Sequence, residues 1–256
     1  MQGTMTYYQP GFIALVFLLG SVRPFAAGAN SRVFNNARDG FSISLPSDWK
    51  EIPLDVLKKF SGAMAKLAPN MEEQEYQYGY QLASFDQWLE CPYIVIQVQN
   101  TGRVAEGQFA KLAQKKEIFE REMKTVETNL SLILSQSQMS EPVYDVERHA
   151  LWIRSEVNVE FVGKVKTLSA ALLTEKGTLN IYCFAKESEF PGYAPLFETI
   201  ANSIQFGEGM KYKPRDSDTN RIDGLLNKIG NGAVLGVAIG AVVVLIVVLL
   251  RRRRTE

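Results

Sequence analysis

One uncharged apolar run near the C-terminus constrains this chain more than any other feature. Residues 229–250 read IGNGAVLGVAIGAVVVLIVVLL and are followed directly by Arg251, Arg252, Arg253 and Arg254. As an α-helix the run would be about 33 Å long, which is enough to cross the hydrocarbon core of a bilayer. We therefore predict a transmembrane helix over 229–250. Because basic residues are retained on the cytoplasmic side, the segment after this helix lies in the cytoplasm. The four arginines then act as a stop-transfer signal in a cytoplasmic tail, residues 251–256.

A second apolar run lies at the N-terminus. Residues 11–22 (GFIALVFLLGSV) are too few to span a bilayer and match the length of a signal-peptide core. Ala27 and Ala29 flank Gly28 as a small-x-small cleavage site, which predicts a signal peptide over 1–29. No Lys or Arg precedes the run, so an uncleaved anchor is the alternative. With the secretion signal and the C-terminal helix together, we expect a single-pass membrane protein whose domain lies outside the cytoplasm, in the periplasm or at the cell surface.

The segment between these ends is one mildly acidic domain. Lys plus Arg and Asp plus Glu both total 28, but four arginines lie in the predicted tail, so the body carries a small acidic excess. Such a body lacks the basic surface of a nucleic-acid-binding protein. We place the domain at residues 30–206. Residues 207–228 are rich in Gly, Asp, Asn and Lys and are predicted to be a juxtamembrane linker.

Hydrophobic periodicity within the domain predicts both strands and helices. Residues 41–45, 92–98 and 157–161 have strand patterns, and turns at Gly163 and Gly177 predict an antiparallel meander. A helix is expected after Pro53, and a short helix and a last strand near residue 206. One long helix is predicted from an apolar stripe interrupted only at Lys116, made of Phe109, Leu112, Phe119, Met123, Val126, Leu130 and Ile133. The fold class is therefore α+β, an antiparallel sheet flanked by helices.

Two short segments of the domain carry a family resemblance. FSISLP-x-x-W over residues 41–49, followed by the helix predicted after Pro53, and ANSIQF over residues 201–206 resemble the PsbP-like family. That family includes extrinsic photosystem proteins and distant relatives. The resemblance implies an α-β-α sandwich and a binding or assembly role rather than catalysis. The transmembrane tail departs from the soluble relatives, so no partner or functional residue is carried over.

A search for catalytic or metal chemistry identifies no site. His149 is the single histidine, and a catalytic role would require a nucleophile and an orienting acid beside it. One histidine and two distant cysteines do not make a structural zinc site. Glu156 and Glu160 fit cross-strand ion pairs with Lys164 and Lys166 better than acid–base catalysis. We expect no catalytic residue, no metal and no cofactor.

The two cysteines and a group of three tyrosines can each be interpreted in two ways, one functional and one structural. Cys91 and Cys183 form an even pair in an exported domain, which permits a disulfide, and two buried free thiols are the alternative. Tyr76, Tyr78 and Tyr80 alternate along one segment. They form either a binding surface or cross-strand packing.

The sequence thus predicts a membrane-anchored exported module that is not an enzyme and binds or assembles an unknown partner. An exported hydrolase of unrecognised type is one alternative. An assembly factor acting mainly through its transmembrane helix is another, since Gly232, Gly236 and Gly240 line one helix face. Such small-residue faces permit close helix packing in lipid, so a homodimer or a contact with another protein's helix is expected there.

Overall fold

The structure is a computed structural model that describes residues 30–67, 74–131, 134–160 and 162–215. The predicted signal peptide with Ala27 and Ala29, and the predicted transmembrane helix with its glycines and arginines, lie outside these residues and stay predictions. In the part of the chain that is described, no helix is long and apolar enough to cross a membrane.

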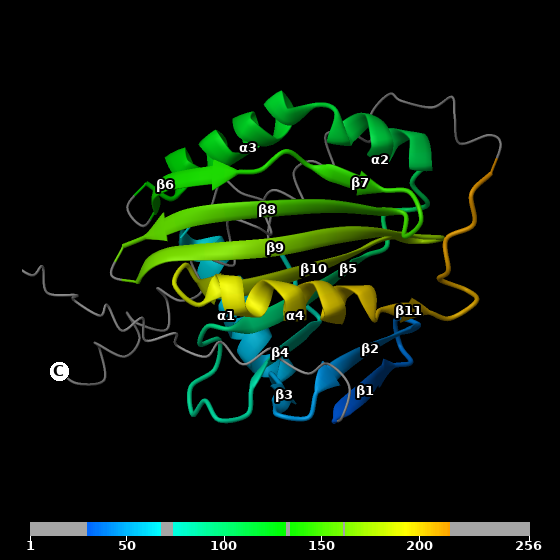
Figure 1. Cartoon of the computed structure of the whole chain (residues 1–256). Helices are drawn as coiled ribbons and strands as arrows, with labels where there is room; N and C mark the ends of the chain where they lie inside the picture. Colours follow the sequence, from blue (N-terminus) through cyan, green and yellow to red (C-terminus); the bar gives the residue numbers. More distant parts are fainter. Residues whose placement is uncertain (1–29, 68–73, 132–133, 161, 216–256) are drawn as a thin grey trace, which may run out of the picture.

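An eight-stranded antiparallel sheet forms the centre of the fold (Figure 1). Its order is β3-β4-β5-β10-β9-β8-β6, and β7 pairs with β8 beside β6. The strands are β3 (Trp49–Glu51), β4 (Tyr78–Leu82), β5 (Tyr93–Gln99), β6 (Leu134–Met139), β7 (Val143–Asp145), β8 (Ala150–Val159), β9 (Gly163–Thr174) and β10 (Gly177–Lys186). The predicted meander is confirmed, since β8, β9 and β10 pair in sequence order. Gly177 permits the tight β9–β10 turn, because an added Cβ would lie 2.0 Å from the carbonyl oxygen of Gln99.

A small sheet packs on one face of the large one. It contains β1 (Ser31–Asn36), β2 (Phe41–Pro46) and β11 (Gln205–Phe206), with β2 in the middle. β1 and β2 pair antiparallel and form an N-terminal hairpin. Alternation along β2 works as expected: Phe41, Ile43 and Leu45 are buried, whereas the residues between them are half-buried.

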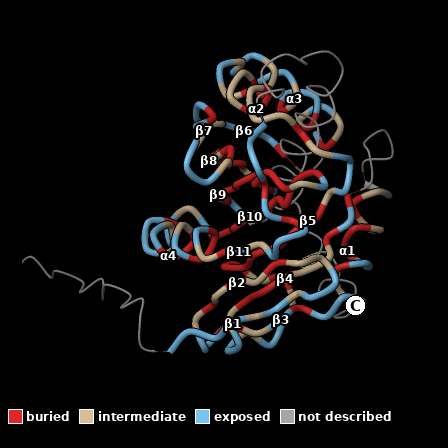
Figure 2. The backbone as a smooth tube through the Cα atoms, turned by 90° about the vertical axis from the view of Figure 1, so that its right-hand side faces the viewer, coloured by how far each residue is buried: buried red, intermediate tan, exposed pale blue. Residues whose placement is uncertain are grey.

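Helices cover both faces of the large sheet and create two hydrophobic cores. We call the face of the large sheet that is covered by α1 (Leu54–Leu67), α2 (Glu106–Ala113) and α3 (Lys116–Asn129) the helix face. The core between this face and the three helices is the helix-face core. The second core lies between the large sheet, the small sheet and α4 (Phe190–Asn202). Figure 2 shows α1 and α4 on opposite sides of the buried strands. The α+β class with helices on both faces of an antiparallel sheet is therefore confirmed for the described residues.

The prediction of one long helix was wrong. The chain leaves the helical path at Gln114 and Lys115, and Lys115 has a ψ of 63°. The break falls beside Lys116, the one polar interruption of the stripe. Both halves still direct their stripe into the helix-face core, since Phe109 and Phe119 are fully buried. Because the sheet is twisted, two shorter helices with different axes can both stay packed on it, whereas a single straight helix would lose contact at one end.

The predicted boundary after residue 206 was also wrong. Residues 207–215, which we call the strap, lie against the domain as far as they are described. Met210 and Tyr212 are each 5% exposed. Met210 packs in the second core and Tyr212 in the helix-face core, so the strap passes around the end of the sheet. The folded unit therefore includes the strap, and the expected linker starts no earlier than residue 216.

Candidate functional site: a groove beside the β7–β8 hairpin

The β7–β8 hairpin is the element from which the candidate site is built. Its turn is held by Asp145, whose Oδ1 accepts backbone N–H bonds from Glu147 at 3.0 Å and Arg148 at 3.1 Å. His149 closes the turn with a φ of 50°, a left-handed conformation in which histidine is found more often than most residues. In β8, Leu151 and Ile153 lie in the helix-face core, whereas Trp152 between them packs against the second core. The two faces of the hairpin thus have different neighbours.

A groove of about 270 Å³ lies between this hairpin and α4. Its floor is apolar: Trp152 is half-buried and Leu168 is buried. In Figure 1 the hairpin lies above α4 with β9 between them, and β9 supplies Leu168. The groove exists because α4 packs over β9 and β10 and leaves the face of β8 partly uncovered.

Two arginines of β8 and its turn form polar bridges across the groove. Arg148 Nη1 donates a hydrogen bond of 2.7 Å to the carbonyl oxygen of Asn202 at the end of α4. Arg154 Nη2 pairs with Oε1 of Glu198, one turn earlier on α4. Both guanidinium groups stay partly accessible and keep N–H donors that these contacts do not use. The site therefore combines an aromatic floor with hydrogen-bond donors on its walls.

The rim of the groove exposes apolar surface. Val143 of β7 is 62% exposed and Val146 of the turn is 64% exposed. Val143 lies directly across from Trp152 in the strand register. Exposed apolar side chains next to a half-buried tryptophan and arginines have the composition of protein interaction surfaces. The arrangement suits a segment of another protein and lacks the nucleophile–base geometry of catalysis among the described residues.

The opposite face of the hairpin is held by one carboxylate. Tyr144 donates its hydroxyl to Oε1 of Glu106 at 2.8 Å, and His149 Nδ1 lies 3.1 Å from the same oxygen. Because an ionised carboxylate only accepts, Nδ1 must carry the proton. Burial first, and then the hydrogen bond to Glu106 and its charge, raise the pKa of Tyr144, so its hydroxyl stays a donor. Glu106 therefore fixes β7 and the turn of the hairpin to α2.

The same cluster continues into the strap. The backbone N–H of Glu106 donates to the hydroxyl of Tyr212 at 2.9 Å, and the rings of His149 and Tyr212 are 5.1 Å apart. The Arg103 guanidinium lies over the Tyr212 ring, 4.5 Å from its centroid. Thus Tyr212 joins the strap, α2 and the hairpin that forms the groove.

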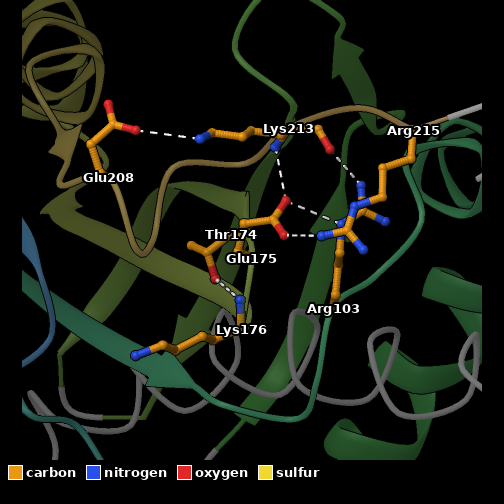
Figure 3. A network of polar contacts seen from close by, with 7 residues as sticks. All are labelled: Arg103, Thr174, Glu175, Lys176, Glu208, Lys213 and Arg215. Carbon is orange, nitrogen blue, oxygen red and sulfur yellow. Dashed lines mark hydrogen bonds and ion pairs between the residues drawn. The ribbon is translucent and has the colours of Figure 1, made fainter.

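Glu175, in the β9–β10 turn, fastens the last part of the strap (Figure 3). Its Oε1 accepts the backbone N–H of Lys213 at 2.9 Å and the Nε–H of Arg103 at 3.2 Å, and its Oε2 pairs with Arg215. Burial alone would raise the pKa of Glu175. The Lys213 and Arg103 hydrogen bonds and the Arg215 charge outweigh burial, so the pKa is lowered. We call this carboxylate and its three donors the clasp.

The two cysteines do not form the disulfide that was considered. Both are buried free thiols. Cys91 belongs to the helix-face core and Cys183 to the second core, so the sheet separates them. Burial raises the pKa of Cys91 to about 12 and also raises that of Cys183. Neither thiol is a ready nucleophile at neutral pH.

The three tyrosines do not form an exposed binding surface. Tyr76 is 2% exposed and Tyr80 is fully buried. They lie in different cores, where Tyr76 stacks on Phe60 and Tyr80 packs against Phe34. Tyr78 is half-buried and donates its hydroxyl to Asp39. Packing, the alternative considered from the sequence, explains all three.

The ion-pair interpretation is confirmed for Glu156. Its carboxylate lies 3.0 Å from Lys164 Nζ and 3.2 Å from Lys166 Nζ on the neighbouring strand. The Lys164 hydrogen bond contributes most to lowering the pKa of Glu156, which keeps this carboxylate ionised rather than poised as an acid. His149 hydrogen-bonds only Glu106 through its side chain within the described residues. An orienting acid is thus present, without a nucleophile at hydrogen-bond distance.

The sequence offered little signal for the residues that build the groove and its support. Trp152, Arg148 and Glu198 meet from two segments that are distant in the chain. Glu106 and His149 are 43 residues apart. Only Val146 gives a clue, because it is an apolar residue within the polar turn between two strands.

Comparisons with known proteins find a structural neighbour of the domain. No protein-family model matches the chain, and no curated protein matches it. The solution structure of cyanobacterial PsbP (CyanoP) from Synechocystis sp. PCC 6803 is similar, with a TM-score of 0.47 and 14% sequence identity. The match covers 71% of this chain and 96% of that chain. A likeness of this size does not assign the chain to a family, so membership of the PsbP-like family stays a prediction.

Proposed function

We propose that this chain is a membrane-anchored binding module of the cell exterior or periplasm, and that the β7–β8 groove holds a segment of a protein partner. The observation that carries the proposal is the groove itself. A half-buried tryptophan lies on its floor, and the two most exposed large apolar side chains of the described residues, Val143 and Val146, lie on its hairpin.

The composition of the groove favours a polypeptide. An apolar side chain of the partner would pack on Trp152 between Val143 and Leu168. Backbone carbonyls of the partner would accept hydrogen bonds from the donors of Arg148 and Arg154 that the α4 contacts leave over. Interfaces use aromatic and arginine side chains in this way because they give large contact area together with directional donors.

The strap supports a role beside the membrane. The described chain ends at Arg215, and the predicted transmembrane helix starts at residue 229. The intervening residues span at most about 50 Å when fully extended, so a domain fastened at its strap is confined near the bilayer. A partner in the groove would be held within the same distance of the membrane.

Site-specific photocrosslinking in intact cells tests the proposal. A photoreactive amino acid at Val143 is expected to give a discrete adduct, which Trp152→Ala removes. The matched control is the same amino acid at Leu54, which is 44% exposed at the start of α1 on the helix-bearing face. Equal adducts from both positions, or an adduct at Val143 that survives Trp152→Ala, would contradict the groove as the binding site.

The predicted membrane helix provides the separate test of the alternative assembly role. If Gly236→Ile abolishes crosslinking to the partner and Trp152→Ala does not, the membrane helix and not the groove binds the partner. A bulky β-branched side chain at Gly236 would hold two packed helices apart. Loss of the adduct with Trp152→Ala alone would leave the groove as the binding element.

A further inference from the structure

A second cavity of about 240 Å³ lies at the end of the molecule where the strap begins. Four separate segments surround it: the β1–β2 turn, the residue after β5, the β9–β10 turn and the first residues of the strap. Gly40 adopts a φ of 64° there, and a Cβ on it would lie 2.9 Å from Cγ of Met210. The strap can therefore form one wall of the cavity because this turn carries a glycine.

The charged groups around the cavity are unequally paired. Asp39 Oδ2 accepts the hydroxyl of Tyr78 at 2.6 Å, and Glu208 Oε2 lies 3.3 Å from Lys213 Nζ. Arg38 and Lys176 also line the cavity, and neither makes an ion pair or side-chain hydrogen bond with any described residue. The hydroxyl that Asp39 accepts carries no charge, so the lining holds two unpaired cations, one carboxylate without a charged partner and one that Lys213 pairs.

Neutral donors surround the two cations. Asn100, Glu208 and Gly209 line the cavity, and neither the Asn100 side-chain amide nor the backbone N–H of Glu208 or Gly209 donates to a described residue. Concave loop backbones with free N–H groups bind anions, and glycine lets a ligand approach the chain closely. The volume is below the range of about 300–1,000 Å³ that drug-sized ligands occupy, so it suits one small ionic group.

We infer that this cavity is a phosphate-binding site. A guanidinium offers planar paired donors and an ammonium a compact point charge, a combination that suits the several oxygens of a phosphate. A free phosphate and a phospholipid headgroup present the same group. Both sources are physically accessible, since the chain is fastened as far as Arg215 and the residues from there to the predicted membrane helix at residue 229 span about 50 Å at most. The site is separate from the groove and does not rest on its proposed role.

Titration of the full-length chain in a maltoside detergent, which contains no phosphate, tests this site. With 15N-glycine labelling, inorganic phosphate is expected to shift the amide signals of Gly40, Gly207 and Gly209 saturably. Sodium chloride of equal ionic strength is expected to leave them in place. Gly79, which packs against Ile52 and Leu57 in the sheet, reports on the intact fold.

Charge removal at the two cations gives the decisive comparison. Arg38→Gln combined with Lys176→Gln is expected to raise the dissociation constant for phosphate at least tenfold while the Gly79 signal stays unchanged. Lys211→Gln is the matched control, because Lys211 is an exposed strap lysine outside the cavity lining. Absence of saturable shifts, or equal affinity in the double variant and the wild type, would overturn the inference.

A second titration distinguishes the sources of the phosphate. Short-chain phosphatidic acid shifting the same glycines at lower concentration than inorganic phosphate would identify a headgroup site. Inorganic phosphate acting at equal or lower concentration would identify a site for the free anion. A short-chain glycolipid without phosphate is the control, and shifts of equal size with that glycolipid would contradict phosphate recognition.

Discussion

The two faces of the large sheet are covered to different extents, and the difference explains why the groove proposed to bind a partner lies where it does. On the helix face, α2 and α3 extend over the outer strands β6, β7 and β8, and the cover is continuous with α1. On the other face, the small sheet and α4 cover the inner strands and leave the face of β8 only partly covered. A sealed face contributes stability, whereas the incompletely covered face leaves Trp152 and its arginines accessible.

Removing the strap should have the largest effect, because the strap enters both cores. A fragment of residues 30–208 loses Met210 and Tyr212, and each buried side chain of this size contributes roughly 2–5 kcal/mol to the free energy of unfolding. Urea unfolding is expected to show a loss of at least about 4 kcal/mol relative to residues 30–215. Equal midpoints for the two fragments would show that the strap only rests on the surface and that the domain ends near residue 206.

A paired substitution on the two faces should give the next largest difference. Phe119→Ala empties a fully buried position on the helix face and should cost about 3–5 kcal/mol. Trp152→Ala removes a half-buried side chain from the groove and should cost only about 1–2 kcal/mol. Chemical denaturation of both variants measures this contrast. A larger loss for Trp152→Ala would make the tryptophan a core residue and weaken the case for the groove.

The clasp should add a smaller, pH-dependent contribution. The pKa of Glu175 is lowered in the folded chain, so its contribution to stability is present above the unfolded carboxyl pKa of about 4.3. That contribution is lost as pH falls from there through the folded pKa. The difference in unfolding free energy between wild type and Glu175→Gln should thus be largest at pH 7 and should shrink towards zero as the pH drops below about 4. A difference that stays constant with pH would exclude the ionised carboxylate as its source.

The smallest expected difference between the two faces can be measured with the two thiols, since Cys91 lies in the helix-face core and Cys183 in the second core. Both are buried with a raised pKa, so iodoacetamide at pH 8 should label neither in the folded protein and both in urea. If the sheet faces open together, Cys91 and Cys183 should show the same opening free energy in native-state labelling. Faster labelling of one thiol would show that its face opens separately.

Strand positions were predictable from the sequence, whereas the meeting of distant segments was not. Alternation identified β2 and the meander because a sheet side that faces a core demands an apolar residue at every second position. The helix break at Lys115 was missed because an apolar stripe records burial and not axis direction. The strap was missed because Met210 and Tyr212 are isolated in a polar stretch, and their burial depends on pockets built by other elements. The groove and the Glu106 cluster were missed for the same reason, because both are formed by residues from segments that are distant in the sequence.

The pairing of the second strand with the last one has a consequence for the timing of folding. β11 pairs with β2, and Ser44 donates its backbone N–H to Ser203 Oγ across 159 residues of chain. Closing so long a loop before its contacts form slows folding, and the small sheet is incomplete until the final strand is available. A chain emerging in order from a ribosome therefore stays without a complete second core until Met210 is free.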